Sequence, residues 1–169
     1  AGVWLVALLF VGFHPLLIES TNAKITVRGR LAHDMDAVPG QVLSGTVIVD
    51  NETNEAQQAR VYLRDYLFFA DGSNAYDDPG TAPRSSSAWV SFSPQNLTIP
   101  PGESADVSYE IMVPADATPG SWWCMLMVEG VDPNSAESTT REETLGDRQV
   151  GFRQVTRYGV QLATHLNDF

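Results

Sequence analysis

The chain has 169 residues, of which 43% are apolar and 18% are charged, and its formal net charge is −11. This balance excludes an intrinsically disordered chain, which would be richer in charge and poorer in apolar residues. It also excludes nucleic-acid binding through a phosphate footprint, because such binding requires clustered lysines and arginines.

The start of the chain predicts an export or anchoring segment. Residues 3–18 are apolar around His14 and Pro15, and their first part has the length of a signal-peptide hydrophobic region. Thr21 and Ala23 place small residues before a candidate cleavage site. An uncleaved membrane anchor and a buried strand are the alternatives. We expect a signal peptide or membrane anchor in residues 1–23 and one domain in residues 24–169, outside the cytoplasm (periplasmic, secreted or at the cell surface).

Short extended segments separated by turns follow this leader. Residues 25–31 alternate apolar and polar side chains, and residues 38–41 read as a turn. Residues 42–51 are rich in β-branched side chains and predict a strand. A polar loop is expected over residues 51–58.

The longest strand is expected over residues 59–70. Its polar and basic positions, Arg60, Tyr62 and Arg64, would point outward. The positions expected to point inward are Val61, Leu63, Leu67 and Phe69.

Residues 71–87 predict a long exposed loop, because the segment is polar and interrupted by glycines and prolines. Its acidic start, DGSNAYDD, offers Asp71, Asp77 and Asp78 as oxygen ligands for calcium. The spacing is not that of an EF-hand loop, so a solvated connection is the alternative.

The second half of the chain gives the clearest strand pattern. Residues 89–93 predict a short strand, and Leu97 and Ile99 predict another. Residues 107–113 alternate apolar and polar side chains with a period of two, which is typical of a strand with one buried face.

The segment at residues 121–129 is apolar on both faces, so it predicts a strand in the centre of its sheet, covered on both sides. A second polar loop is expected over residues 131–149. Residues 150–166 predict a final strand pair or one long bent strand, in which Gly159 would mark a bulge or kink.

No part of the chain has helical periodicity over a long stretch. About seven short strands with regular turns predict an all-β fold, an immunoglobulin-like antiparallel β-sandwich. The single cysteine, Cys124, cannot form an intramolecular disulfide, and its apolar surroundings predict a small buried side chain.

Two neighbouring tryptophans point to opposite faces of the strand at residues 121–129. One of Trp122 and Trp123 is expected to fill the core. The other would pack as well, or stay exposed as a platform on which a sugar or peptide stacks.

The sequence predicts no enzyme and no cofactor. His14, His33 and His165 lack the spacing of a zinc pair, and His33 is expected in a loop with Asp34 and Asp36. The chain has no G-x-S-x-G nucleophile motif and no glycine-rich phosphate loop.

Several segments resemble one protein family. They are ITVRGR (25–30), GTVIVDNETN (45–54), ARVYLRDYLFF (59–69), WVSFSPQNLTIPPGESADVSYEI (89–111) and GFRQVTRYGVQLATHL (151–166). Together they resemble the N-terminal immunoglobulin-like domain of periplasmic pilus-assembly (PapD-like) chaperones. Residues 113–123 also resemble a phrase found in other bacterial surface immunoglobulin-like domains.

This resemblance implies a mechanism of binding. Such chaperones lend an exposed edge strand to a pilus subunit, and two basic residues hold the subunit's terminal carboxylate. Arg28 or Arg30 near the first strand, and Arg153 or Arg157 near the last, are the matching residues. A guanidinium suits this role because it binds a carboxylate with two parallel hydrogen bonds. The alternative is that these arginines only keep the surface soluble.

We therefore expect a non-enzymatic extracytoplasmic module for protein binding or assembly, chaperone-like and acting by edge-strand pairing. Its partner would be another envelope or surface protein, and it would meet a membrane only through an uncleaved N-terminal segment. The alternative is a structural cell-surface or adhesion module that binds glycan or calcium. An accessory domain of an enzyme is a third, more distant interpretation.

Overall fold

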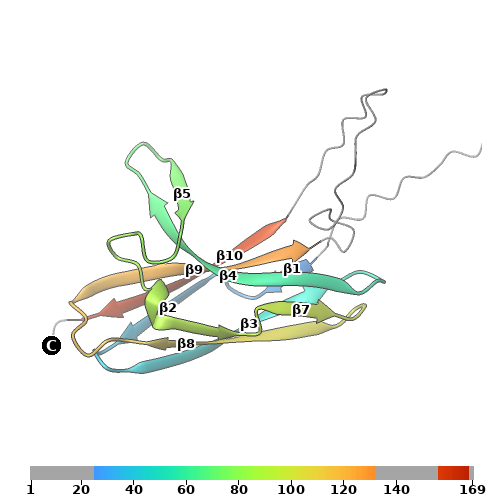
Figure 1. Cartoon of the computed structure of the whole chain (residues 1–169), viewed down its shortest axis with the longest axis horizontal. Helices are drawn as coiled ribbons and strands as arrows, with labels where there is room; N and C mark the ends of the chain where they lie inside the picture. The colour runs from blue at the N-terminus through green and yellow to red at the C-terminus, as the bar shows by residue number, and fades with distance from the viewer. Residues whose placement is uncertain (1–24, 132–155, 168–169) are drawn as a thin grey trace, which may run out of the picture.

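The structure is a computed structural model that describes residues 25–131 and 156–167, which form two β-sheets packed face to face (Figure 1). The four-stranded sheet has the order β1 (Ile25–Arg28), β3 (Val42–Asn51), β8 (Ser104–Met112), β6 (Val90–Ser93). The six-stranded sheet has the order β2 (Ala32–Ala37), β10 (Arg157–Leu166), β9 (Gly120–Val131), β4 (Gln57–Phe68), β5 (Asn74–Asp77), and β7 (Asn96–Ile99) also pairs with β4. A 3₁₀ helix, η1 (Ser87–Trp89), precedes β6.

The predicted sandwich is confirmed, and its core lies between the two sheets. Along β8, Val107 and Ile111 are fully buried while the alternating polar residues face solvent. Strand β9 lies between β10 and β4, as its two apolar faces predict, and Leu126 is fully buried. The core is completed by apolar side chains from every long strand: Ile25, Val47, Val49, Ala59, Val61, Leu97, Ile99, Val113, Cys124, Val128, Val160, Leu162 and Leu166.

The described residues contain ten strands instead of about seven. Two stretches of the chain, residues 25–37 and 90–99, are each divided between the two sheets. The chain pairs with β3 as β1 and then crosses at Gly29 to join the other sheet as β2; in the same way β6 pairs with β8 and β7 pairs with β4. Splitting a strand in this way lets one segment close the edges of both sheets.

The loop predicted around His33, Asp34 and Asp36 is wrong, because these residues belong to β2. This strand runs parallel to β10, in the register His33 with Leu162, so the sandwich is not purely antiparallel. His33 and Met35 point inward while Asp34 and Asp36 are exposed. The sequence did not reveal this strand because a polar residue, His33, occupies one of its inward positions. The Nδ1 atom of His33 lies 2.6 Å from the Tyr109 hydroxyl.

The loop predicted over residues 71–87 is also wrong in part. Residues 74–77 form β5, which pairs with the end of β4 in a hairpin that stands off the sandwich (Figure 1). The segment then returns, and its last residues, Ser86 and Ser87, are buried. Ser86 N donates to the Trp123 carbonyl at 3.1 Å, so this segment replaces β4 beside the start of β9.

Asp65 marks the point where β4 leaves the sheet. Its side chain is fully buried and accepts hydrogen bonds from Ala82 N at 2.8 Å and from the hydroxyls of Ser85 and Ser87 at 2.6 Å each. Burial alone would raise the pKa of Asp65, but these hydrogen bonds outweigh it and hold the pKa below its ordinary value. Beyond Asp65 the strand has no core beneath it, so the predicted inward position of Phe69 is wrong: this side chain is 52% exposed.

Two smaller predictions also need correction. Gln57 and Gln58, expected in a polar loop, belong to β4, and Gln57 is buried. Gly159, expected to mark a bulge, pairs with Met127 in an uninterrupted register. A Cβ at this position would lie 2.7 Å from Met125 Cε, the end of a flexible side chain.

Some predictions lie outside the described residues: the leader at residues 1–23, nearly all of the loop at residues 131–149, His14 and Arg153. In the described part of the chain, no helix has the length and apolar character needed to cross a bilayer.

Candidate functional site

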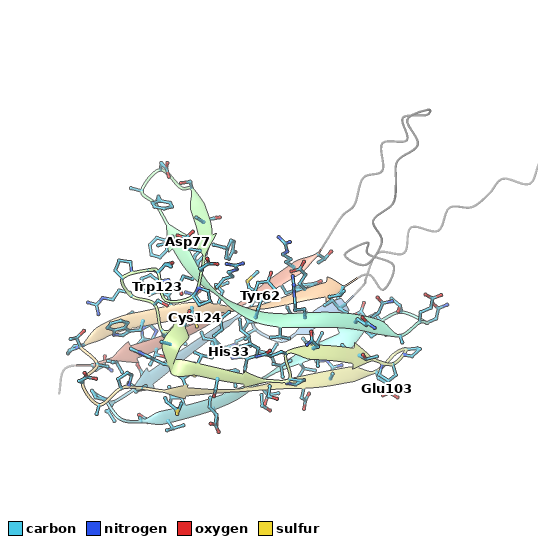
Figure 2. The ribbon with its side chains drawn as sticks, in the orientation of Figure 1. His33, Tyr62, Asp77, Glu103, Trp123 and Cys124 are labelled. Atoms are coloured by element: carbon cyan, nitrogen blue, oxygen red, sulfur yellow. The ribbon has the colours of Figure 1, made fainter. Side chains whose placement is uncertain are left out.

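The outer face of the six-stranded sheet carries an open pocket of about 730 Å³, which we call the outer-face pocket. Strand alternation aims alternate side chains of β4, β9 and β10 at this face, away from the core. Figure 2 shows Tyr62 on this side of β4, below the β4–β5 hairpin. The pocket is lined by Arg60, Tyr62, Leu63, Arg64, Tyr76, Asp78, Pro79, Met127, Glu129, Arg157 and Gly159.

Glu129 is the centre of the polar contacts in the pocket. A single oxygen, Oε2, accepts from the Tyr62 hydroxyl at 2.9 Å and lies 3.3 Å from both Arg60 Nη2 and Arg157 Nε. Burial would raise the pKa of Glu129, but the hydrogen bonds from Tyr62 and Arg60 and the charge of Arg157 outweigh it and hold the pKa below its ordinary value of 4.5. Glu129 is therefore ionised at neutral pH and holds two guanidinium groups at one wall.

Tyr62 lies between two further cationic contacts. The guanidinium carbons of Arg60 and Arg64 are 5.3 and 5.8 Å from its ring centroid, distances at which a cation is attracted to an aromatic face. Burial and the Glu129 carboxylate raise the pKa of Tyr62, so its hydroxyl stays a donor. Arg64 also forms an ion pair with Asp78, whose side chain is 81% exposed.

The pocket is positively charged although the protein is acidic. Three guanidinium groups and two carboxylates line it, whereas the whole chain carries a net charge of −11. A positive site in a negative protein favours an anionic group from a partner.

One edge of β10 is open next to this pocket. Strand β9 pairs with all of β10, but β2 pairs only with Gln161–Leu166. Among the described residues, no strand pairs with the second edge of residues 157–160, which we call the open edge of β10. Gln161 N donates to the Leu31 carbonyl on the β2 side at 2.8 Å. Because backbone groups alternate in direction along a strand, those of Gly159 and Arg157 point toward the open edge.

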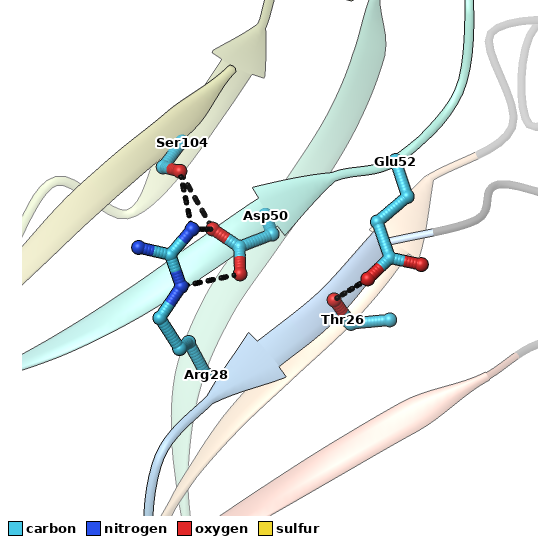
Figure 3. Close-up of polar contacts among 5 residues, drawn as sticks. All are labelled: Thr26, Arg28, Asp50, Glu52 and Ser104. Carbon is cyan, nitrogen blue, oxygen red and sulfur yellow. Dashed lines mark hydrogen bonds and ion pairs between the residues drawn. The ribbon is translucent and has the colours of Figure 1, made fainter. Parts of the chain in front are cut away.

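The arginines predicted to hold a carboxylate lie in different places. Arg157 lines the outer-face pocket. Arg28 lies on β1 of the other sheet, where Nε and Nη2 bind Asp50 at 2.9 and 2.8 Å, and Ser104 donates to the same carboxylate at 2.6 Å (Figure 3). The structure thus does not bring Arg28 and Arg157 together.

Arg30 lies in the crossing from β1 to β2. Within the described residues this exposed side chain has no ion pair. Arg30 precedes Leu31, whose carbonyl contacts β10 at the end of the open edge. Of the two arginines predicted near the first strand, Arg30 is therefore the one that has no ion pair among the described residues and lies close to β10. Arg153 lies outside the described residues.

The three aspartates considered for calcium do not meet. Asp71 lies at the tip of the hairpin, where it accepts from Ser73 N at 2.9 Å. Asp77 and Asp78 lie at its base, and Asp78 is paired with Arg64. In the described ranges, no group of three or more His, Cys, Asp or Glu residues is arranged to hold a metal ion.

His165 takes part in an exposed serine–histidine–aspartate contact. Its Nδ1 lies 2.8 Å from Ser121 Oγ and its Nε2 lies 3.5 Å from Asp34. These side chains are outside the outer-face pocket, and a hydrolytic triad also needs an oxyanion site and a substrate cavity beside it.

The tryptophans lie on opposite faces of β9, as predicted. Trp122 packs on the core side, with its ring centroid 4.8 Å from that of Trp89. Trp123 lies on the outer face (Figure 2), where its ring centroid is 5.8 Å from that of Phe68. Its Nε1 donates a hydrogen bond to the Tyr66 carbonyl at 2.9 Å. Both are half-buried, so neither is a free stacking platform.

The sequence prediction missed most of the pocket. Arg60, Tyr62 and Arg64 were recognised only as outward positions of a strand. A sharper signal was present: Glu129 is the one charged residue of β9. A lone carboxylate on a doubly covered strand needs cationic partners, and the basic stripe of the neighbouring strand supplies them.

The sequence matches no known family model and no curated protein. The fold, by contrast, matches many solved structures. A PapD-like domain of human CEP192 aligns with a TM-score of 0.56 and 11% identity over 97% of this chain and 99% of that domain. The chain has the PapD-like immunoglobulin fold.

Chaperones of fimbriae and pilins are among the structures that this fold matches. The class 5 fimbriae chaperone CfaA aligns with a TM-score of 0.55 and 15% identity over 86% of this chain and 57% of its own. A chain of the Salmonella enterica SafA pilin–SafB chaperone complex aligns with a TM-score of 0.54 and 11% identity over 88% of this chain and 57% of its own. The PapD-like domain therefore spans little more than half of these chaperone chains.

Proposed function

We propose that this PapD-like domain is a non-enzymatic, extracytoplasmic module that binds another envelope or surface protein by pairing a strand with the open edge of β10. The observation that carries the proposal is that β2 pairs with β10 only from Gln161 onward. Residues 157–160 therefore have one strand neighbour, β9, among the described residues. An edge with free backbone groups is a template for strand addition.

The fold comparisons support this type of binding. One matching structure is described as a pilin in complex with its chaperone, and another as a chaperone–tip adhesin complex. The human PapD-like domain has the same fold, so the fold alone leaves the class of partner open. The open edge is therefore the feature that favours strand pairing in this chain.

Arg30 and Arg157 are the proposed anchors for the end of the partner strand. They lie near opposite ends of the open edge: Arg30 precedes Leu31, whose carbonyl accepts from Gln161 N, and Arg157 is the first residue of β10. A terminal carboxylate held by one of these arginines would fix the register of the added strand, because a bidentate pair is directional. Arg28 contributes less to this binding, since its guanidinium group already donates two hydrogen bonds to Asp50.

Site-specific photo-crosslinking in the cells that produce the protein tests the proposal. A p-benzoylphenylalanine at Leu31, which is 45% exposed beside the open edge, is expected to crosslink a discrete envelope protein. The same probe at Met112, 55% exposed on the outer face of the four-stranded sheet, is the control and should give no such adduct. Equal crosslinking at both positions, or none at Leu31, would rule out binding at the open edge.

A proline substitution then separates strand pairing from side-chain contact. Gly159→Pro removes an amide that points to the open edge, and proline is tolerated at strand edges. Val160→Pro removes a bond to β9 and should destabilise the fold itself. The adduct at Leu31 is expected to disappear in a folded Gly159→Pro variant.

A further inference from the structure

The outer-face pocket opens toward the open edge of β10 through a gap in the row of side chains. Arg157, Gly159 and Gln161 occupy successive outward positions of β10, and Gly159 contributes no side chain to that row. Both Arg157 and Gly159 line the pocket. At Gly159 the surface between the open edge and the pocket is covered only by the flexible ends of Met125 and Met127, whose nearest atoms lie 2.7 and 3.3 Å from where a Cβ would stand.

We propose that the outer-face pocket receives an acidic side chain of the strand that pairs with β10, and so selects partners with an Asp or Glu at one register position. This inference rests on the proposed function and adds a specificity rule to it. The position is the one directly opposite Gly159, because residues opposite one another in paired strands point to the same face.

The reach of the side chain fits this position. Neighbouring strands lie about 4.8 Å apart, and Cβ atoms of directly opposite residues lie about 5 Å apart. A glutamate opposite Gly159 would extend over the glycine toward Arg157, the neighbouring outward residue of β10, once the flexible ends of Met125 and Met127 move aside. A residue with a bulky side chain at position 159 would close this path.

The arginines of the pocket retain donors for such a group. Arg60 and Arg157 each direct one nitrogen at the same oxygen of Glu129, whereas a guanidinium carries five N–H donors. Arg64 is held by Asp78, whose side chain is mostly solvent-exposed, and an exposed ion pair of this kind contributes little. An incoming carboxylate can therefore bind Arg60 and Arg157 without displacing Glu129, and can compete with Asp78 for Arg64.

Glu129 makes the site ready for an anion. One buried carboxylate restrains two cationic groups, and Tyr62 restrains Arg60 and Arg64 through its ring. Side chains held in place before binding lose less conformational entropy on binding. The excess of one positive charge in the lining is the complement of a single carboxylate.

Selection from a phage-displayed library of random dodecapeptides tests the inference with a defined probe. Wild-type protein is expected to select strand-forming peptides that share an Asp or Glu at one position. Replacing that residue by its amide should weaken binding about tenfold or more, as for the loss of a hydrogen bond between charged groups. Protection of the Gly159 amide from hydrogen exchange in the complex would show that the peptide pairs with the open edge.

Arginine variants locate the acidic preference. With Arg60→Gln/Arg64→Gln, which leaves Arg157 in place, the penalty for the amide peptide should fall several-fold. Arg84→Gln is the matched control, since this arginine stacks on Trp122 outside the pocket and should leave the penalty unchanged. If the double variant does not fold, Asp78→Asn provides the same test, because removal of the competing carboxylate should tighten binding of the acidic peptide several-fold.

The outcomes distinguish this inference from the proposed function. Peptides that protect Gly159 but show no acidic position, or an acidic preference that Arg60→Gln/Arg64→Gln leaves undiminished, overturn the inference and leave strand pairing intact. Selection of no peptide at all overturns both. Binding of an acidic oligosaccharide such as polygalacturonate, together with peptides that lack an acidic position, overturns the inference in favour of a glycan site.

Discussion

Glu129 on β9 and Arg157 on β10 face each other directly across an antiparallel strand pair, and Arg157 Nε lies 3.3 Å from Glu129 Oε2. The contact joins the two features on which binding is proposed to depend. Arg157 begins the open edge of β10, and Glu129 positions the cationic wall of the outer-face pocket. A change at either residue should therefore affect both stability and partner choice.

Glu129→Gln is expected to destabilise the fold near neutral pH by about 1–3 kcal/mol, the usual cost of losing hydrogen bonds to a charged group. The pKa of Glu129 is lower in the folded protein than its ordinary value of 4.5. The stability that this carboxylate contributes is therefore fully present above pH 4.5 and is lost as the pH falls through the folded-state pKa. The stability difference between wild type and variant should shrink in acid.

Urea unfolding of wild type and Glu129→Gln across the acid range measures this difference. Glu110→Gln is the control, because Glu110 is exposed on the outer face of the four-stranded sheet. A gap between wild type and Glu129→Gln that stays constant from neutral to acid pH would contradict the assigned ionic role.

Asn51 joins three segments at one end of the sandwich, and its loss should be costly. Its Nδ2 donates to the carbonyls of Glu55 at 2.7 Å and Ile99 at 2.9 Å, and its Oδ1 accepts from Thr53 N at 3.0 Å. Asn51→Ala removes the side-chain donor of the buried Ile99 carbonyl and the acceptor of Thr53 N, so we expect a loss of about 2–3 kcal/mol in the free energy of unfolding. Chemical denaturation measures it, with the exposed Asn54→Ala as control; similar small effects at both positions would refute the role of Asn51.

Predicting the fold from the sequence succeeded where side-chain alternation was the dominant signal. The pattern of β8 and the two-sided apolar character of β9 identified the core and the central strand. Prediction failed where a polar residue took an inward position. His33 in β2 and Asp65 in β4 both face inward, and each is satisfied by a partner far away in the sequence: Tyr109 for His33, and Ser85 and Ser87 for Asp65.

The candidate site was less accessible to prediction for the same reason. Arg157 was identified through the family resemblance, but its partners come from other strands. Arg60 meets Glu129 only because β4 and β9 pair in the register that places them opposite each other. Register depends on the whole sheet, whereas alternation within one segment reveals only which face a residue occupies.

Two glycines are expected to differ in how much stability the same substitution costs. A Cβ at Gly45 would meet the ring of Tyr109, with Cε1 only 2.8 Å away, and this ring is held by His33. A Cβ at Gly159 would meet the flexible ends of Met125 and Met127 at 2.7 and 3.3 Å. We expect Gly45→Ala to cost about 1–3 kcal/mol and Gly159→Ala less than about 1 kcal/mol, because methionine repacks readily. Denaturation of the two variants measures the order, and an equal or reversed cost would contradict it.

Cys124 should be chemically silent while the protein is folded. The side chain is fully buried on the core face of β9, and burial raises the pKa of its thiol to about 11. Since the thiolate is the reactive form, iodoacetamide at neutral pH should label Cys124 only as fast as the protein unfolds, and urea should release the full reactivity. A Ser91→Cys/Cys124→Ala variant, with its thiol on the exposed face of β6, is the control and should react at once. Rapid labelling of native Cys124 would mean that β9 presents the other face to the core, and the residues now assigned to the outer-face pocket would then lie inside the sandwich.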